Sequence, residues 1–225
     1  MNRILYLIVL TIMSLSAHAQ INELGIFAGG ANYIGDVGPT NYVAPNEPAL
    51  GIIYKWNRSP RHSWRASFTY ADIYSKDADS DMSGRQERDY KFKNSVKELS
   101  LGLEFNFFDF NLHEPDFKIT PYVYSGISYF WSDEQYIENG ISRRLDSKGN
   151  LAIPMTVGIK SNIFENFVLG FEVGARYTFT DDIDGSNHKD YPQLAFGNLN
   201  SNDWYVFTGL TLTYTFGVQP CYCVE

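Results

Sequence analysis

Hydrophobic and polar residues alternate with a period of two along most of this chain, most clearly in its C-terminal segment. The apolar parity there holds Trp204, Val206, Leu210, Leu212, Tyr214 and Phe216, and the small polar parity holds Gly209, Thr211, Thr213 and Thr215. This period predicts a β-strand with one apolar and one polar face. Aromatic residues stand at both ends of the apolar face, which is typical of strands that contact lipid.

The same alternation predicts eight strands, at residues 24–34, 50–57, 62–74, 96–108, 119–131, 151–162, 166–180 and 203–217. These strands run roughly 8–15 residues, which is enough for the ~9–11 that a tilted transmembrane strand needs. In the fifth strand the alternation is less regular, and Ser125-Gly126 predicts a β-bulge there.

The connections between these strands alternate in length. Long connections are expected at 35–49, 75–95, 132–150 and 181–202, and shorter ones at 58–61, 109–118 and 163–165. Long loops on one side and short turns on the other are typical of outer-membrane barrels. We therefore predict an all-β fold, an eight-stranded antiparallel transmembrane outer-membrane β-barrel with short periplasmic turns and long extracellular loops. The even number of strands predicts that both termini are periplasmic.

Parity alone does not tell the inside of a barrel from its outside, so a soluble β-sandwich or a lipocalin-like barrel is the alternative fold. Two features favour the membrane. Aromatic residues make up 16% of the chain although its mean hydropathy is −0.26. Glycines recur on the small or polar parity, as a narrow barrel interior requires; they are Gly102, Gly126, Gly158, Gly170, Gly174 and Gly209. The net charge of −8 argues against a nucleic-acid partner.

The N-terminus is predicted to be a secretory signal peptide. Arg3 precedes the short apolar run 4–15, and Ala17-His18-Ala19 forms a cleavage site. The expected organisation is a signal peptide at 1–19, the barrel at 20–217 and a periplasmic tail at 218–225. No cysteine follows the cleavage site directly, which argues against a lipoprotein.

The polar parity carries charges of both signs in similar number. The residues expected to point inward are Lys55, Arg65, Glu98, Glu104, Lys160, Glu172 and Arg176. An eight-stranded barrel is just wide enough for side chains to fill it, and an unpaired buried charge is costly. We expect a charge cluster that packs the interior as a polar plug, and a path for protons or ions is the alternative.

Other chemistry-bearing residues give weaker signals. Asp77, Asp79 and Asp81 and the segment 181–185 place carboxylates that suit Ca²⁺, but neither matches an EF-hand loop, and solvated acids that cap turns are the simpler interpretation. The histidines of the mature chain have no Ser–Asp or Cys partner nearby in sequence. No phosphate loop or zinc signature is present. We expect no enzyme activity, no cofactor and no metal.

The tail carries the chain's only cysteines, Cys221 and Cys223. One intervening residue makes a disulfide between them strained, and an oxidising periplasm disfavours free thiols. An intermolecular disulfide is one hypothesis, and an unused or local pair is the other.

The start of the mature chain, residues 23–36, resembles the PorG family, whose first strand ends in a similar aromatic-x-Gly-Asp, here Tyr33, Gly35 and Asp36. The segment 176–184 is similar too, although Asp182 and Gly185 stand where an aromatic residue and a second acid are expected. The resemblance implies an outer-membrane component of the type IX secretion and gliding machinery of Bacteroidetes. It also implies that the barrel anchors a periplasmic ring of PorK/GldK lipoprotein and PorN/GldN, through the periplasmic turns and the tail with Cys221 and Cys223. The alternative function is a surface barrel that is surrounded by outer-membrane lipids and whose loops 75–95 and 181–202 are adhesive or bind a ligand.

Overall fold

The computed structural model describes residues 21–112, 114, 116–138, 140–164, 166–198 and 200–217. The predicted signal peptide, the tail with Cys221 and Cys223, and His113 lie outside the described residues.

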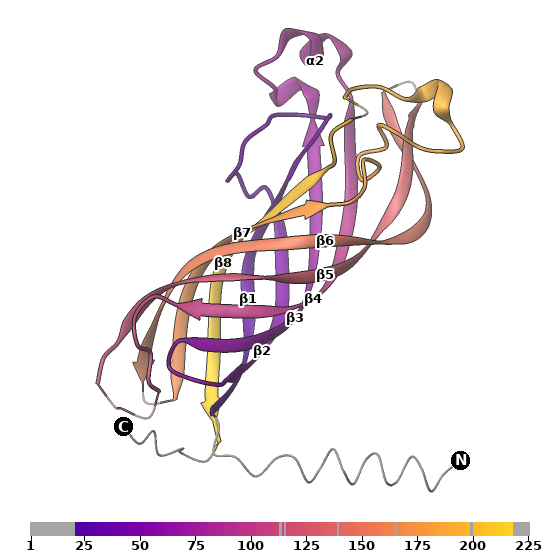
Figure 1. Cartoon of the computed structure of the whole chain (residues 1–225). Coiled ribbons are helices and arrows are strands. Elements are labelled where there is room, and N and C mark those ends of the chain that lie inside the picture. Colours follow the sequence, from indigo (N-terminus) through magenta and orange to yellow (C-terminus); the bar gives the residue numbers. More distant parts are fainter. Residues whose placement is uncertain are drawn as a thin grey trace, which may run out of the picture.

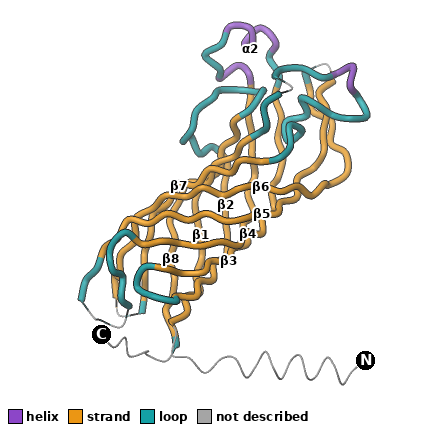
Figure 2. The backbone as a smooth tube through the Cα atoms, in the orientation of Figure 1, coloured by secondary structure: helices purple, strands orange, loops and turns teal. Residues whose placement is uncertain are grey.

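Eight antiparallel strands form one closed barrel in chain order, with β8 returning to β1 (Figure 1, Figure 2). The strands are β1 (Ile21–Ile34), β2 (Glu47–Asn57), β3 (His62–Lys76), β4 (Lys91–Asn106), β5 (Ile119–Glu138), β6 (Ile141–Phe164), β7 (Phe167–Thr178) and β8 (Trp204–Phe216). Closure pairs every strand with two neighbours, so the described barrel has no open sheet edge of the kind that lipid would leave unsatisfied. The predicted all-β, eight-stranded antiparallel barrel of the outer-membrane type is confirmed.

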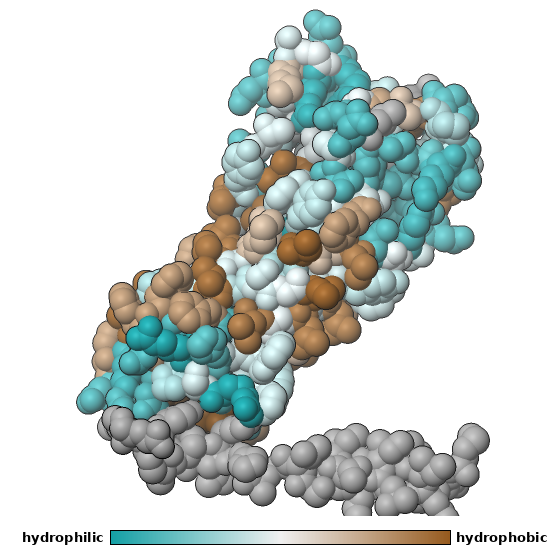
Figure 3. All heavy atoms as spheres, in the orientation of Figure 1, coloured by the Kyte–Doolittle hydropathy of each residue, from teal (hydrophilic) through white to brown (hydrophobic). Residues whose placement is uncertain are grey.

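The large apolar side chains point outward, which settles the question that parity alone left open. The exposed parity of β4 holds Leu99, Leu101 and Leu103 and continues to Phe107 just after the strand, whereas Glu98 and Glu104 on the other parity are fully buried. At a rise of ~3.3 Å per residue and a tilt of ~40°, the eight steps from Leu99 to Phe107 cover ~20 Å along the barrel axis, comparable to the ~25 Å of an outer-membrane apolar band. Figure 3 shows this band around the middle of the barrel, with hydrophilic residues beyond it.

The two ends of the barrel differ as predicted. At one end, called here the short-turn end, the connections are 58–61, 107–118 and 165–166, and Asn22 of β1 pairs with Phe216 of β8. At the other, the long-loop end, residues 35–46, 77–90 and 179–203 join the strands. The second of these loops contains η1 (Asp77–Asp79) and α2 (Ser83–Arg88), and the last contains η2 (Pro192–Leu194) (Figure 1). Among the described residues, no helix is long and apolar enough to cross a membrane.

Two sequence-based expectations are wrong. Residues 132–150 are not a long loop: β5 continues to Glu138 and β6 begins at Ile141, so the two strands extend as a hairpin at the long-loop end. The register between β4 and β5 also runs unbroken through Ser125 and Gly126. The register shift of β5 lies instead in its pairing with β6, between Asp133 and Gln135. A polar hairpin without an apolar face gives no alternation to detect.

Strands β4 and β5 come close at Gly102 and Gly126, which face each other and have no side chains to keep the backbones apart. A Cβ added to Gly126 would lie 2.2 Å from the Leu101 carbonyl oxygen and 2.4 Å from the Gly102 Cα. This close approach of the two backbones explains the glycine of Ser125-Gly126 better than a bulge does.

The interior is filled in two different ways. Charged side chains occupy the part toward the short-turn end. Apolar side chains fill the part toward the long-loop end, where they form one buried cluster that includes Phe27, Tyr33, Ile73, Phe92, Val96, Phe130, Ile137, Ile183 and Phe207. The outer surface is therefore apolar where lipid would contact it, while the interior is packed with side chains as in a soluble protein.

Candidate functional site

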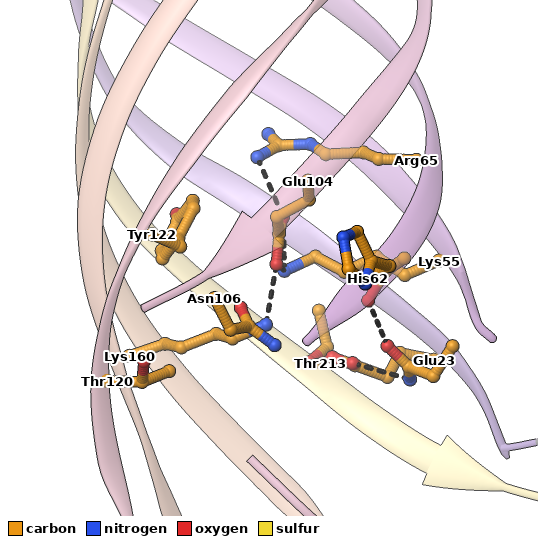
Figure 4. Close-up of polar contacts among 12 residues, drawn as sticks. Glu23, Lys55, His62, Arg65, Glu104, Asn106, Thr120, Tyr122, Lys160 and Thr213 are labelled. Carbon is orange, nitrogen blue, oxygen red and sulfur yellow. Dashed lines mark hydrogen bonds and ion pairs between the residues drawn. The ribbon is translucent and has the colours of Figure 1, made fainter. Parts of the chain in front are cut away.

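Glu104 is the centre of the charge cluster near the short-turn end (Figure 4). The Lys55 Nζ lies 2.9 Å from both Glu104 carboxylate oxygens, and the Lys160 Nζ lies 2.5 Å from Oε1. Arg65 approaches the same carboxylate at 3.6 Å. One fully buried acid thus neutralises two buried lysines that come from different sides of the barrel.

Arg65 has its main partner in Glu172 across the barrel. Its two terminal nitrogens each donate to one Glu172 oxygen at 2.7 Å, the bidentate geometry that is strongest for this pair. The Tyr122 hydroxyl donates to the same carboxylate at 2.6 Å. β3, β5 and β7 are joined through this single acid.

A third pair lies closer to the apolar part of the interior. Arg176 contacts Glu98 at 3.3 Å, and the Tyr205 hydroxyl donates to Glu98 Oε2 at 2.6 Å. The Arg176 guanidinium also lies 4.4 Å from the centre of the Phe207 ring, a cation–π contact. The predicted interior residues Arg65, Glu98, Glu104, Lys160, Glu172 and Arg176 therefore all lie inside the barrel, in contact with opposite charges.

Sequence reasoning missed Glu23, a fourth buried acid. It accepts hydrogen bonds from the Asn57 amide at 2.9 Å and from the Thr213 hydroxyl at 2.6 Å. The signal was present, because Glu23 shares the parity of Gly25 and Phe27, but the first strand was predicted to begin at Leu24, whereas β1 begins at Ile21.

The interior charges of the spanning strands balance. Four cations, Lys55, Arg65, Lys160 and Arg176, face four acids, Glu23, Glu98, Glu104 and Glu172, and each of the eight is at most 3% exposed. A row of ion pairs at contact distance fills the barrel and cross-links its walls. This arrangement suits a rigid plug more than a passage.

The long-loop end is closed by the last loop, 179–203, which folds into the mouth of the barrel. Ile183 is fully buried, and its carbonyl accepts hydrogen bonds from the side-chain amides of Asn94 (2.9 Å) and Gln135 (2.6 Å). The Val37 amide donates to Asp184 Oδ2 at 3.2 Å. The loop is thus anchored to β4, β5 and the first loop.

Asp203 holds the other end of this loop. Its carboxylate accepts hydrogen bonds from the Ile183 amide at 2.9 Å and from the Tyr33 hydroxyl. Burial and the neighbouring Asp184 raise the pKa of the Asp203 carboxyl well above its usual range, although both hydrogen bonds act in the opposite direction. Burial also raises the pKa of Asp184.

Two further acids of the loop have unusual titration. Burial raises the pKa of Asp181 to about 7, against a hydrogen bond from Asn187. Burial and then Glu134 raise the pKa of Asp182 to about 7. The mouth is thus rich in carboxyl groups that lack a full complement of cations.

The acids of the second long loop do not converge as a calcium site would. Asp77 is fully buried and bonds Arg88 at 2.7 Å, whereas Asp79 pairs with Lys76 on the surface. Within the described part of the chain, the group of three ligating side chains that lies close enough for a metal ion is Glu134, Asp182 and His188.

A cavity of about 620 Å³ lies at the long-loop end, between the end of α2, the β5–β6 hairpin and η2. The guanidinium of Arg88 lies over the rings of both Tyr90 and Phe196, at 4.9 and 4.7 Å from their centres, and the two rings contact each other edge to face. Asp89 and Gln193 add polar groups to the lining. The size and the mixed lining fit a small ligand.

His62 lies at the short-turn end, exposed, with its Nδ1 3.2 Å from the Ser59 hydroxyl. It forms no ion pair with an acid among the described residues, whereas His188 lies 3.8 Å from Glu134. The roles predicted for Cys221 and Cys223 concern residues outside the described range.

The structure is similar to solved outer-membrane barrels at low sequence identity. Ail, the attachment invasion locus protein of Yersinia pestis, aligns with a TM-score of 0.48 and 12% identity over 88% of this chain and 99% of its own. OprG of Pseudomonas aeruginosa gives 0.44 and 10% over 89% and 98%, and a major outer membrane protein of Thermus thermophilus gives 0.43 and 15% over 88% and 100%. No curated protein matches the chain. The model of a family described as a domain of unknown function, DUF6089, matches residues 2–225, so the chain belongs to the DUF6089 family.

Proposed function

We propose that this protein is a non-enzymatic outer-membrane component of the type IX secretion and gliding machinery, which anchors the periplasmic PorK/PorN (GldK/GldN) ring to the outer membrane. The observation that carries the anchoring role is the filled interior. Balanced ion pairs cross-link the barrel walls near the short-turn end, and the last loop closes the opposite mouth. Such a barrel suits a fixed attachment point better than a conduit.

The machinery itself is proposed on the resemblance of residues 23–36 and 176–184 to the PorG family. In this proposal the short-turn end faces the periplasm, because both described chain ends and all three shorter connections lie there. The tail that follows β8 then lies on the side of the ring. The exposed Arg61–Asp109 ion pair offers the partner a polar contact at the same end.

The test is copurification of the ring proteins with the barrel from detergent-solubilised outer membranes. Removal of residues 218–225 is expected to abolish copurification, and Arg61→Glu is expected to weaken it. Arg143→Glu is the matched control, because Arg143 is equally exposed but lies at the long-loop end. The anchor role fails if the truncated barrel inserts normally and still copurifies with the ring proteins.

The covalent form of the contact is tested separately with Cys221→Ser/Cys223→Ser on a non-reducing gel. A reducible adduct in the wild type that disappears in the variant is expected. If neither protein forms an adduct, the disulfide hypothesis fails while the non-covalent anchor stands.

The cavity beside Arg88 favours a second candidate function, a surface barrel whose extracellular loops bind a ligand. Its aromatic and polar lining provides both stacking surfaces and hydrogen-bonding groups. Tyr90→Ala/Phe196→Ala distinguishes the two functions, because it removes this lining and leaves the short-turn end intact. Loss of secretion or gliding in this variant, with retention of both in the barrel without its tail, would favour surface binding.

A further inference from the structure

Three metal-ligating side chains meet at the long-loop end from two separate segments. Glu134 lies in β5 at the register shift between Asp133 and Gln135, and Asp182 and His188 lie in the loop 179–203. One ligand atom from each of the three lies within 4.8 Å of the others, and the His188 Nε2 is 3.8 Å from Glu134 Oε2.

The buried imidazole of His188 is an independent indication that this cluster binds a ligand. His188 is 3% exposed, and its Nε2 has no hydrogen-bond partner. Oδ1 of Asp182 is also buried without a partner. A buried polar atom that loses water and gains no hydrogen bond costs ~1–3 kcal/mol, so two such atoms beside a third ligand need an explanation.

We propose that Glu134, Asp182 and His188 form a binding site for a first-row divalent cation of the zinc type. One imidazole nitrogen with two carboxylate oxygens is a donor set that Zn²⁺ accepts, with water as the fourth ligand. Ca²⁺ and Mg²⁺ fit less well, because they take six or more oxygen ligands and avoid imidazole. At bond lengths of ~2.0–2.2 Å, tetrahedral ligand atoms stand ~3.4 Å apart, so the distances between the three ligand atoms need to shorten by at most ~1.4 Å.

The surroundings set the conditions for binding. Lys148 contacts Oε1 of Glu134 and leaves Oε2 for the metal. The Asp190 amide donates to the His188 Nδ1 at 3.1 Å, so the ring proton of neutral His188 lies on Nε2 before the metal binds. Loading Nε2 moves this proton to Nδ1, and the Asp190 amide then needs another acceptor. This cost lowers the affinity without removing any ligand.

A cation at this position would join the last loop to the β5–β6 hairpin. Glu134 and Asp182 are 48 residues apart in the sequence. The hydrogen bond from the Gln135 side-chain amide to the Ile183 carbonyl already joins the same two segments. The metal would thus hold the last loop, 179–203, against β5, which with β6 is one of the two longest strands. This role is independent of any periplasmic partner.

The experiment uses the mature barrel in lipid nanodiscs, in a Cys221→Ser/Cys223→Ser background so that thiols do not bind the metal. Isothermal titration with Zn²⁺ is expected to show one site, and Co²⁺ is expected to give the visible absorption of a tetrahedral complex. Glu134→Gln and His188→Asn should each weaken Zn²⁺ more than about 10-fold, because even an outer-shell partner contributes that much. His62→Asn and Asp146→Asn, which change an exposed histidine and an exposed acid elsewhere, are the matched controls.

Two results overturn the proposal. One is Zn²⁺ binding that is equal in the wild type and in Glu134→Gln, a half-buried position where substitution leaves the barrel folded. The other is a wild-type protein that gives no Co²⁺ absorption and binds Zn²⁺ no more tightly than Ca²⁺. The heat-dependent gel shift of folded barrels checks that each variant is folded.

Discussion

Glu104→Gln is the most informative perturbation of the interior, because it removes one charge and almost no volume. Glu104 is fully buried, and it is the acid that contacts the ammonium groups of both Lys55 and Lys160. Arg65 keeps its bidentate bond with Glu172 when Glu104 is neutralised. The substitution therefore strands two lysines inside the barrel while the neighbouring ion pair stays intact.

The expected loss follows from this count. Breaking one buried ion pair by removing a single partner costs ~3–5 kcal/mol, and here two cations lose the same partner. The cation–π contacts of Lys160 with the Phe110 and Tyr122 rings are present before and after the substitution, so they do not offset this loss. Because two cations lose their partner, we expect the free energy of unfolding to fall by at least ~3–5 kcal/mol.

The assay is urea unfolding of the barrel in lipid vesicles, followed by tryptophan fluorescence and by the gel shift of the folded form. Glu114→Gln is the matched control, because it makes the same chemical change in the exposed Glu114–Lys118 ion pair and should leave the midpoint unchanged. Adding Lys160→Met to Glu104→Gln should recover part of the loss. If Glu104→Gln unfolds at the same urea concentration as the control, the interior charges are solvated and the plug argument is wrong.

Three more predictions test the packing and the mouth. Gly126→Ala should lower the yield of folded barrel, because its Cβ would meet the Leu101 carbonyl, whereas Gly84→Ala in open space should not. Ile183→Ala should loosen the last loop by about 2–5 kcal/mol, seen as faster proteolysis of 179–203, and unchanged cleavage would contradict its anchoring role. The raised pKa of Asp203 means that its contribution to loop docking is complete below the unfolded pKa of ~3.9 and is lost as pH rises through the higher folded value. Amide exchange at Ile183, corrected for the intrinsic rate, should therefore be less protected at pH 8 than at pH 5, and equal protection would refute this.

The strands and the lipid-facing surface could be predicted from the sequence because the membrane selects one parity. Leu99 and Leu101 meet lipid while Glu98 and Ser100 meet the interior, and this difference of environment is what produces the period of two. Seven of the eight interior charges, all except Glu23, were predicted from the same parity. Which parity points outward could not be read from the period itself, since a soluble barrel has the same alternation with its faces exchanged.

The prediction failed where the lipid ends. In β6 the residues 141–150 face water at the long-loop end, so no apolar side is required and the segment looks like a loop. The mouth was missed for another reason. The Tyr33–Asp203 hydrogen bond joins residues 170 positions apart, and a local pattern does not report which distant residues barrel closure brings together.

The two kinds of filling explain how the side chains of this eight-stranded barrel and its last loop fill its interior. In the charged part of the interior, eight charges balance four against four, and each cation contacts an acid that another strand supplies. Near the long-loop end the strands leave the lipid, and their inner face changes from charged to apolar. Ile183 completes this apolar part from a loop, in the way that a helix or strand would complete the core of a soluble domain. The barrel therefore behaves as one folded core, which ion pairs stabilise toward the short-turn end and apolar packing stabilises toward the long-loop end.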